Sequence, residues 1–206
     1  MENVLEFAKY IGLFIAGCVI AYTTCKKELS SYFNKQKSKV STNLPKQSSL
    51  DVKIVEKMEY TKELLNADHI QVYEFHNGEH YSDGRSAMKL SCTYEVDKAG
   101  AVSIRHNSVG IPIACIPHFV DKILTDGKFF CDDLEKLKVS MPATYEFKKS
   151  NSIGCFADYA IKNKYNQIVA FIAVIWNNPK DYNANELEIE KLALFVENKL
   201  DEMPKD

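Results

Sequence analysis

The chain lacks the cysteine pattern of a protein held together by disulfide bonds. No two of its six cysteines form a CxxC pair; they occur singly at positions 18, 25, 92, 115, 131 and 155. Four of them lie scattered through apolar stretches of the later sequence, which is typical of reduced, mostly buried thiols. The sequence therefore predicts a domain stabilised by its core and not by cross-links.

Several motifs of enzymes and nucleic-acid-binding proteins are also absent. There is no phosphate loop, no glycine-rich nucleotide turn and no Ser-His-Asp arrangement. The net charge is −2, and the part outside the basic linker described below is acidic. Because nucleic-acid binding needs a basic face, we expect no nucleic-acid partner, and we expect no enzymatic activity.

One stretch near the N-terminus lacks charge altogether. Residues 10–25 carry no charged side chain, and Lys26 and Lys27 follow at once. A spanning helix needs about 20 residues. Extending the stretch back to Val4 adds four apolar residues and only two charged ones, Glu6 and Lys9, which would lie near the membrane surface. The sequence predicts a single transmembrane helix over residues 3–25, with the lipid bilayer as a partner.

Two other readings of this stretch fit the residues less well. A cleaved secretory signal needs a basic start, which the first three residues lack. A lipid-modified cysteine at Cys18 would be followed by polar residues, but Val19, Ile20 and Ala21 are apolar.

The charges that follow the span predict its orientation. Residues 26–50 contain one acid, Glu28, and a series of lysines: Lys26, Lys27, Lys35, Lys37, Lys39 and Lys46. Positive residues beside a span stay in the cytoplasm. We therefore expect a single-pass protein of the inner (cytoplasmic) membrane with its N-terminus out, a basic flexible linker over 26–50, and a cytoplasmic C-terminal domain.

The later sequence alternates between helical and strand patterns. Helices are expected over residues 51–66, 117–125, 144–150 and 183–203, the last beginning with a capping box formed by Asn183 and Glu186. Strands are expected over residues 69–75, 89–97, 101–105, 128–131, 153–161 and 168–176. This order predicts an α+β domain over 51–203, with an antiparallel sheet of five to six strands flanked by helices.

Three segments, residues 67–78, 152–159 and 168–176, make this domain resemble a GAF domain, a small-ligand sensor fold related to PAS. The segment Glu74-Phe75-His76-Asn77-Gly78 is also similar to small anchored GAF-like proteins of bacteria and their phages. The resemblance implies a non-catalytic sensor that binds a small ligand, regulates a partner protein, and is able to form a homodimer through its terminal helices. The chain lacks the adjacent Cys-His pair of phytochromes and the Asn-Lys-X-X-Phe-Asp-Glu signature of cyclic-nucleotide GAF domains, so the cofactor and the ligand stay open.

The resemblance places the pocket between one face of the sheet and the helices and loops beside it. The ligand-binding candidates that it implies are Tyr73, Asn77, Tyr81, Arg85, Ser91, Tyr94, His118 and Asp158. Phe75, Phe119 and Cys155 are interpreted as core residues. No metal site is expected, because His76 and His80 lie on either side of a turn and not on one helix face.

Two alternatives to a ligand sensor remain. The pocket of a structural or protein-interaction module would be filled by side chains. A cysteine-dependent reductase of the GAF type would need an activated thiolate and a second cysteine within reach, with Cys131 and Cys155 as the pair to test.

Overall fold

The computed structural model describes the backbone of residues 2–203 and the side chains of residues 21–29 and 43–203. The described chain divides into two units, residues 2–48 and residues 49–203. Helix α1 (Glu2–Leu65) runs through the end of the first unit into the second.

The predicted span and linker both fall on α1. Most of the predicted transmembrane segment 3–25, up to residue 20, lies outside the described side chains. In the part of the chain that is described, no helix combines the length and apolar character needed to cross a membrane. The range 26–50, predicted as a flexible linker, has helical backbone and includes Pro45. Lysine, which occurs six times there, is a good helix former.

The second unit is built on one antiparallel sheet of six strands in the order β3-β2-β1-β6-β5-β4. The strands are β1 (His69–His76), β2 (Lys89–Asp97), β3 (Ile111–Pro112), β4 (Lys128–Cys131), β5 (Cys155–Lys162) and β6 (Ile168–Trp176). β1 and β6 are central, and most of their side chains are buried because helices or loops cover both faces. The predicted α+β class and antiparallel sheet are confirmed.

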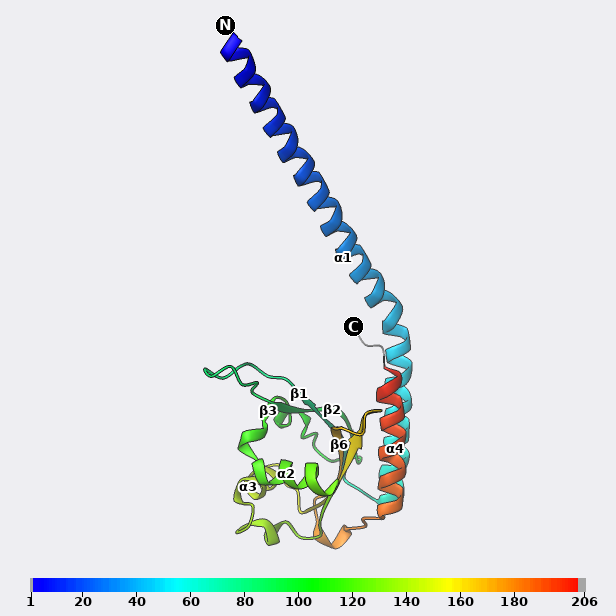
Figure 1. Ribbon diagram of the computed structural model, residues 1–206. Coiled ribbons are helices and arrows are strands. Elements are labelled where there is room, and N and C mark those ends of the chain that lie inside the picture. Colours follow the sequence, from blue (N-terminus) through cyan, green and yellow to red (C-terminus); the bar gives the residue numbers. More distant parts are fainter. Residues whose placement is uncertain (1, 204–206) are drawn as a thin grey trace. The chain divides into compact units, whose positions relative to one another are not determined.

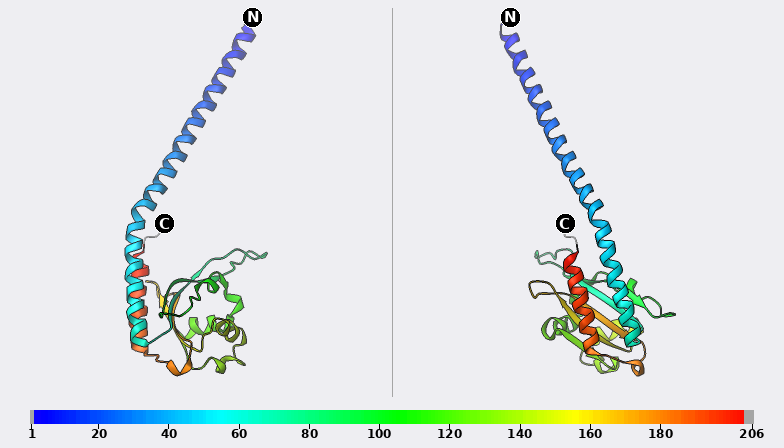
Figure 2. Two further views of the ribbon diagram at one scale, coloured as in Figure 1. Left: turned by 180° about the vertical axis from the view of Figure 1, so that it is seen from behind. Right: turned by 90° about the vertical axis from the view of Figure 1, so that its right-hand side faces the viewer.

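One face of the sheet packs on the last turns of α1 and on α4 (Glu186–Glu202), which lie side by side in Figures 1 and 2. Fully buried Ile54 and Met58 from α1 meet Ile189 and Val196 from α4 in this core. The indole Nε1 of Trp176 donates to the Leu65 carbonyl oxygen at 3.2 Å. We call this side the α1/α4 face.

The opposite face packs on α2 (Pro117–Asp126) and α3 (Pro142–Ser150), with the short 3₁₀ turns η1 (Arg105–Asn107), η2 (Ile113–Cys115) and η3 (Leu134–Leu137) beside them (Figure 1). A further turn, η4 (Pro179–Asp181), leads to α4. Aromatic rings form much of this core; Phe119 packs edge-on against Phe156 and Phe171. We call this side the α2/α3 face.

Two local predictions were wrong. Residues 101–105 form a loop into η1 and not a strand, because the Glu95 carboxylate accepts hydrogen bonds from Ser103 Oγ and from the backbone N–H groups of Ile104 and Arg105. Donors engaged in this way are not free to pair with a neighbouring strand. The N-cap of α4 is Asn185, with no side-chain cap bond, and not Asn183.

Candidate functional site

The centre of the α2/α3 face has a polar row across the sheet. Ala173 on β6 pairs with Gln71 on β1 and with Asp158 on β5. Because side chains alternate between faces along a strand, all three lie on the same face as Tyr73, Phe156 and Phe171. Gln71 and Asp158 are fully buried, so two polar groups flank one small alanine in the floor of this core.

A cavity of about 20 Å³ lies on the same face of the sheet. It is lined by Tyr73, Phe119, Thr144, Lys148, Phe171 and Ile175, among others. A cavity needs a volume of roughly 10–15 Å³ to hold a single water molecule. In the conformation described, side chains therefore fill the position where the resemblance to GAF domains places the ligand.

A buried ion pair lies beside the cavity. Lys148 is on the inward side of α3 with Thr144 and Tyr145, and its ammonium Nζ lies 3.2 Å from Asp158 Oδ2. The two side chains are 7% and 0% exposed. The other carboxylate oxygen of Asp158, Oδ1, is buried and has no hydrogen-bond partner among the described residues. Burial raises the pKa of the Asp158 carboxyl to about 6, and the nearby Lys148 ammonium opposes that shift.

Aromatic rings complete the surroundings of this ammonium. Lys148 Nζ lies 3.6 Å from the centroid of the Phe156 ring and 5.0 Å from that of Phe119. Both distances fall within the range of a cation–π interaction.

A second polar network joins the cavity to the η1 loop. The Tyr73 hydroxyl donates to Gln71 Oε1 at 2.8 Å and lies 3.0 Å from Ser108 Oγ. Gln71 Nε2 in turn donates to Glu95 Oε1 at 2.9 Å. Because the Tyr73 ring also stacks on Phe171 with centroids 4.9 Å apart, one side chain contacts both the cavity and the network.

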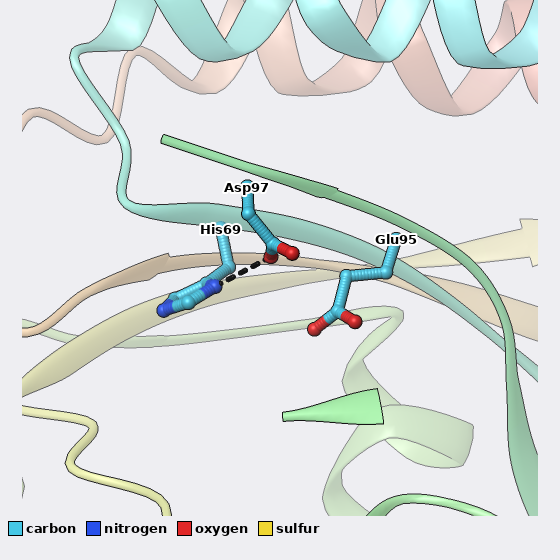
Figure 3. A group of neighbouring side chains, drawn as sticks. All are labelled: His69, Glu95 and Asp97. Atoms are coloured by element: carbon cyan, nitrogen blue, oxygen red, sulfur yellow. Dashed lines mark hydrogen bonds and ion pairs between the residues drawn. The ribbon is translucent and has the colours of Figure 1, made fainter. Parts of the chain in front are cut away.

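His69, Glu95 and Asp97 are the residue types of a metal site and lie close together at the end of this network (Figure 3). His69 Nδ1 lies 2.8 Å from Asp97 Oδ1, as the dashed line in Figure 3 marks. Glu95, however, already accepts hydrogen bonds from four donors, on Gln71, Ser103, Ile104 and Arg105. These occupy the acceptor positions of a carboxylate, so the group braces the η1 loop and does not present an open set of metal ligands.

The structure brings Tyr73 and Asp158 together on the α2/α3 face and places the other site candidates elsewhere. Tyr94 lies on the α1/α4 face, where its hydroxyl donates to Asp51 Oδ1 at 2.6 Å. A β-bulge shifts the register so that Val72 pairs with Tyr94 but Tyr73 pairs with Cys92. The extra residue, Thr93, moves Tyr94 to the face opposite Cys92.

Four candidates belong to the β1–β2 connection or to its base. The Ser91 hydroxyl bonds to His76 Nε2 and accepts from the Gly110 N–H, both at 2.8 Å. Exposed Asn77 precedes Gly78, where a Cβ would lie 2.1 Å from the Ala87 carbonyl oxygen, so only glycine fits. Tyr81 and Arg85 line an open groove of about 400 Å³ against α2.

His118 lies near the start of α2 in a separate groove of about 270 Å³ with Asp121, Lys122 and Ser140. No described contact joins it to Tyr73 or Asp158. The predicted residues thus divide among one buried centre, two surface regions and, for Tyr94, the α1/α4 face.

Cys131 and Cys155 do not form a reactive pair. Burial raises the pKa of the Cys155 thiol to about 12 and raises that of Cys131 above its ordinary value. Cys131 belongs to the core of the α2/α3 face and Cys155 to that of the α1/α4 face. A reductase needs an accessible thiolate, and this geometry provides none at these two residues.

Sequence reasoning missed Lys148 and Phe156. Lys148 adjoins Lys149 in a short polar helix, and lysine is almost never buried without a partner, so the sequence favours an exposed position for both. The available signal was Asp158, an acid within an apolar strand, which requires a buried partner of opposite charge if it faces the core.

Comparisons with known proteins support the fold. No protein-family model matches the chain, and no curated protein matches it. Among solved structures, it is similar to NpR6012g4, a red/green cyanobacteriochrome, at 12% identity and a TM-score of 0.56, over 74% of this chain and 94% of that one.

Two further structures have the same fold. The phycocyanobilin-bound GAF domain from a cyanobacterial phytochrome shows 12% identity and a TM-score of 0.54, over 82% of this chain and 98% of that one. GAF3 from Slr1393 of Synechocystis sp. PCC6803 shows 12% identity and a TM-score of 0.52, over 73% and 95%. The fold of the second unit is therefore GAF-like.

Proposed function

We propose that this chain is a non-catalytic, GAF-like regulatory protein that binds a small ligand on the α2/α3 face and thereby regulates a partner protein. The observation that carries this proposal is the buried Lys148–Asp158 pair, with one carboxylate oxygen unpartnered, inside a largely apolar core. Replacing a buried ion pair with apolar residues is often neutral or stabilising. Stability alone therefore gives little reason for such a pair, whereas ligand recognition does.

A ligand larger than water has to enlarge the cavity. α3 is the movable wall in this proposal, because it is short and supplies Thr144 and Lys148 to the lining. A ligand shifts such an equilibrium only by its difference in affinity for the two arrangements. The ligand would thus stabilise an arrangement in which α3 lies farther from the sheet.

The partner would read this change on the terminal helices or on the η1 loop. The α1/α4 side carries exposed apolar residues on α1, including Val52, Val55 and Tyr60, and on α4, Leu187 and Leu194. These suit a homodimer or a regulated partner protein. The hydrogen bonds from Tyr73 to Gln71 and from Gln71 to Glu95 connect the cavity to the η1 loop, so that a change at the cavity would alter that loop.

Membrane attachment is part of the same proposal. It is supported by the uncharged stretch 10–25 and the lysines after it, which favour a single-pass inner-membrane protein with its N-terminus out and the GAF-like domain in the cytoplasm. A reporter fused after Asp206 that is active outside the cytoplasm would contradict this orientation.

A second candidate function is a protein-interaction module without a ligand. The cavity of about 20 Å³ favours it, since the core of the α2/α3 face is almost filled. For such a module, Tyr60→Ala and Leu187→Ala would abolish partner regulation, and Asp158→Asn would leave it intact.

Thermal unfolding of the full chain in detergent micelles, screened against a broad library of metabolites, separates the two. A ligand at 100 times its Kd adds about 2.7 kcal/mol of stability. We expect Asp158→Asn to remove the shift, while the control Lys149→Met, at the exposed neighbour of Lys148, retains it. If no compound in the library shifts the midpoint, the interaction module is favoured and the sensor is rejected.

A further inference from the structure

Three side chains of the α2/α3 face surround the Lys148 ammonium. Phe156 and Asp158 come from β5, and Phe119 comes from α2. The ammonium lies 3.6 Å and 5.0 Å from the two ring centroids and 3.2 Å from the carboxylate oxygen Oδ2. Two ring faces with one carboxylate are a set of groups that recognises organic ammonium ions. We call Phe119, Phe156 and Asp158 the ammonium cage.

Lys148 occupies this cage from a different element, α3. Its fit is incomplete: charge-assisted N–H···O bonds are usually about 2.7–2.9 Å long, and Asp158 Oδ1 has no partner among the described residues. An ammonium group has three donors, but the backbone of α3 and the lysine stem fix the direction of this one. An untethered ammonium ion is free to orient its donors toward both carboxylate oxygens.

We propose that the ammonium cage is a binding site for a small organic ammonium ligand, and that Lys148 is an internal occupant which the ligand displaces. The proposal rests on the proposed function and names the ligand class of that site. Displacement of Lys148 removes its bond to Asp158, which joins α3 to β5, so ligand binding and movement of α3 are one event.

The geometry limits the ligand class. Carboxylates and phosphates are repelled by the buried Asp158 carboxylate once Lys148 has left. Methylammonium and ethylammonium match the end of a lysine side chain, and larger amines require α3 to move farther.

The other buried lysine shows that this environment is not a general property of the fold. Lys62 Nζ bonds to Glu59 and donates to the Asp97 carbonyl oxygen at 2.8 Å. Among the described residues it has no ring face within cation–π range. Lys62→Ala is therefore a matched control.

The first experiment is chemical rescue in the full chain. Lys148→Ala empties the cage, and we expect methylammonium or ethylammonium chloride to raise its unfolding midpoint saturably, relative to sodium chloride at equal ionic strength and to ethanol. Lys148→Ala combined with Asp158→Asn, and Lys62→Ala alone, should show no such rise. If Lys148→Ala alone is unfolded, recovery of its circular dichroism by the same amines is the readout.

The second experiment tests displacement in the natural sequence. Ethylammonium should increase hydrogen exchange of the α3 amides in the unsubstituted protein, because Lys148 is released, and decrease it in Lys148→Ala, because the cage is filled. The unsubstituted protein should bind at least about tenfold more weakly, since the internal occupant reduces the fraction of open cage.

Equal affinity in both proteins, no rescue, or rescue that persists with Asp158→Asn would overturn the ammonium cage. If amines fail but another metabolite shifts the melting of the unsubstituted protein and requires Asp158, only the ligand class is wrong. If no compound shifts it, the proposed function itself fails.

Discussion

The two faces of the same sheet bury different chemistry. On the α1/α4 face, strand residues such as Val72, Ile172 and Val174 pack on apolar helix residues and form a core of buried apolar side chains. On the α2/α3 face, the buried residues include Gln71 on β1 and Asp158 on β5, and Lys148 is paired with Asp158. The first face accounts for stability, and the second contains groups that stability does not require. This difference separates the part of the fold that is scaffold from the part that we assign to regulation.

The largest expected effect is on the scaffold face. Trp176→Ala removes a fully buried side chain from the α1/α4 core and should lower the free energy of unfolding by about 4 kcal/mol. Chemical denaturation measures it. Val139→Ala, at a residue that is 92% exposed, is the control and should change almost nothing.

Breaking the ion pair from one side should cost almost as much. Asp158→Leu leaves the Lys148 ammonium buried without its counter-ion and should lower stability by about 3 kcal/mol. The exposed pair Lys149–Glu135 provides the comparison, and Glu135→Leu should lower stability far less than Asp158→Leu does. Equal effects of the two substitutions would mean that the Lys148–Asp158 pair is hydrated and behaves like an exposed ion pair.

The pH dependence sharpens the same contrast. Because the folded-state pKa of Asp158 is raised to about 6 from 3.8, the folded protein binds this proton more tightly than the unfolded chain. The contribution of this group to stability therefore increases as the pH falls from above 6 to below 3.8, by on the order of 3 kcal/mol. As the pH falls over this range, we expect the unsubstituted protein to become more stable relative to the Asp158→Asn variant. A difference that is constant from pH 7 to pH 4 would contradict the raised pKa.

The smallest effect concerns the network beside the cavity. Tyr73→Phe keeps the stacked ring but removes the hydroxyl that bonds to Gln71 and lies beside Ser108, and should cost about 1 kcal/mol. Hydrogen exchange of the amides of residues 104–108 should increase, because Gln71, which donates to Glu95, is no longer held by the Tyr73 hydroxyl. Tyr165→Phe, at an exposed residue, should leave exchange unchanged.

Local pattern was sufficient to predict much of the scaffold from sequence. Residues 89–97, 128–131 and 168–176 form strands as expected, because alternating or continuous apolar residues between turn signals leave few alternatives. The strand expected over 101–105 failed because the Glu95 carboxylate, nine and ten residues earlier in the chain, binds the backbone donors of Ile104 and Arg105. Such capture depends on tertiary structure and has no local signature.

The site was predictable only in part, for two physical reasons. Tyr73 and Asp158 became candidates because the resemblance to GAF domains implies a pocket on one face of the sheet, and the structure places both on the α2/α3 face. Tyr94 was assigned to the wrong face because a bulge at Thr93 reverses the alternation of β2. Lys148 was missed because its burial depends on how α3 packs over β5, and the sequence of a nine-residue helix does not reveal that packing.

The most direct test combines Lys148→Met with Asp158→Leu in the full chain and measures both the unfolding free energy and the thermal shift caused by ligands. We expect the double variant to be at least as stable as the unsubstituted protein, with a better-packed α2/α3 face, and to have lost every ligand response. A double variant as unstable as Asp158→Leu alone, or one that still responds to ligand, would show that the buried charges serve the fold and not recognition.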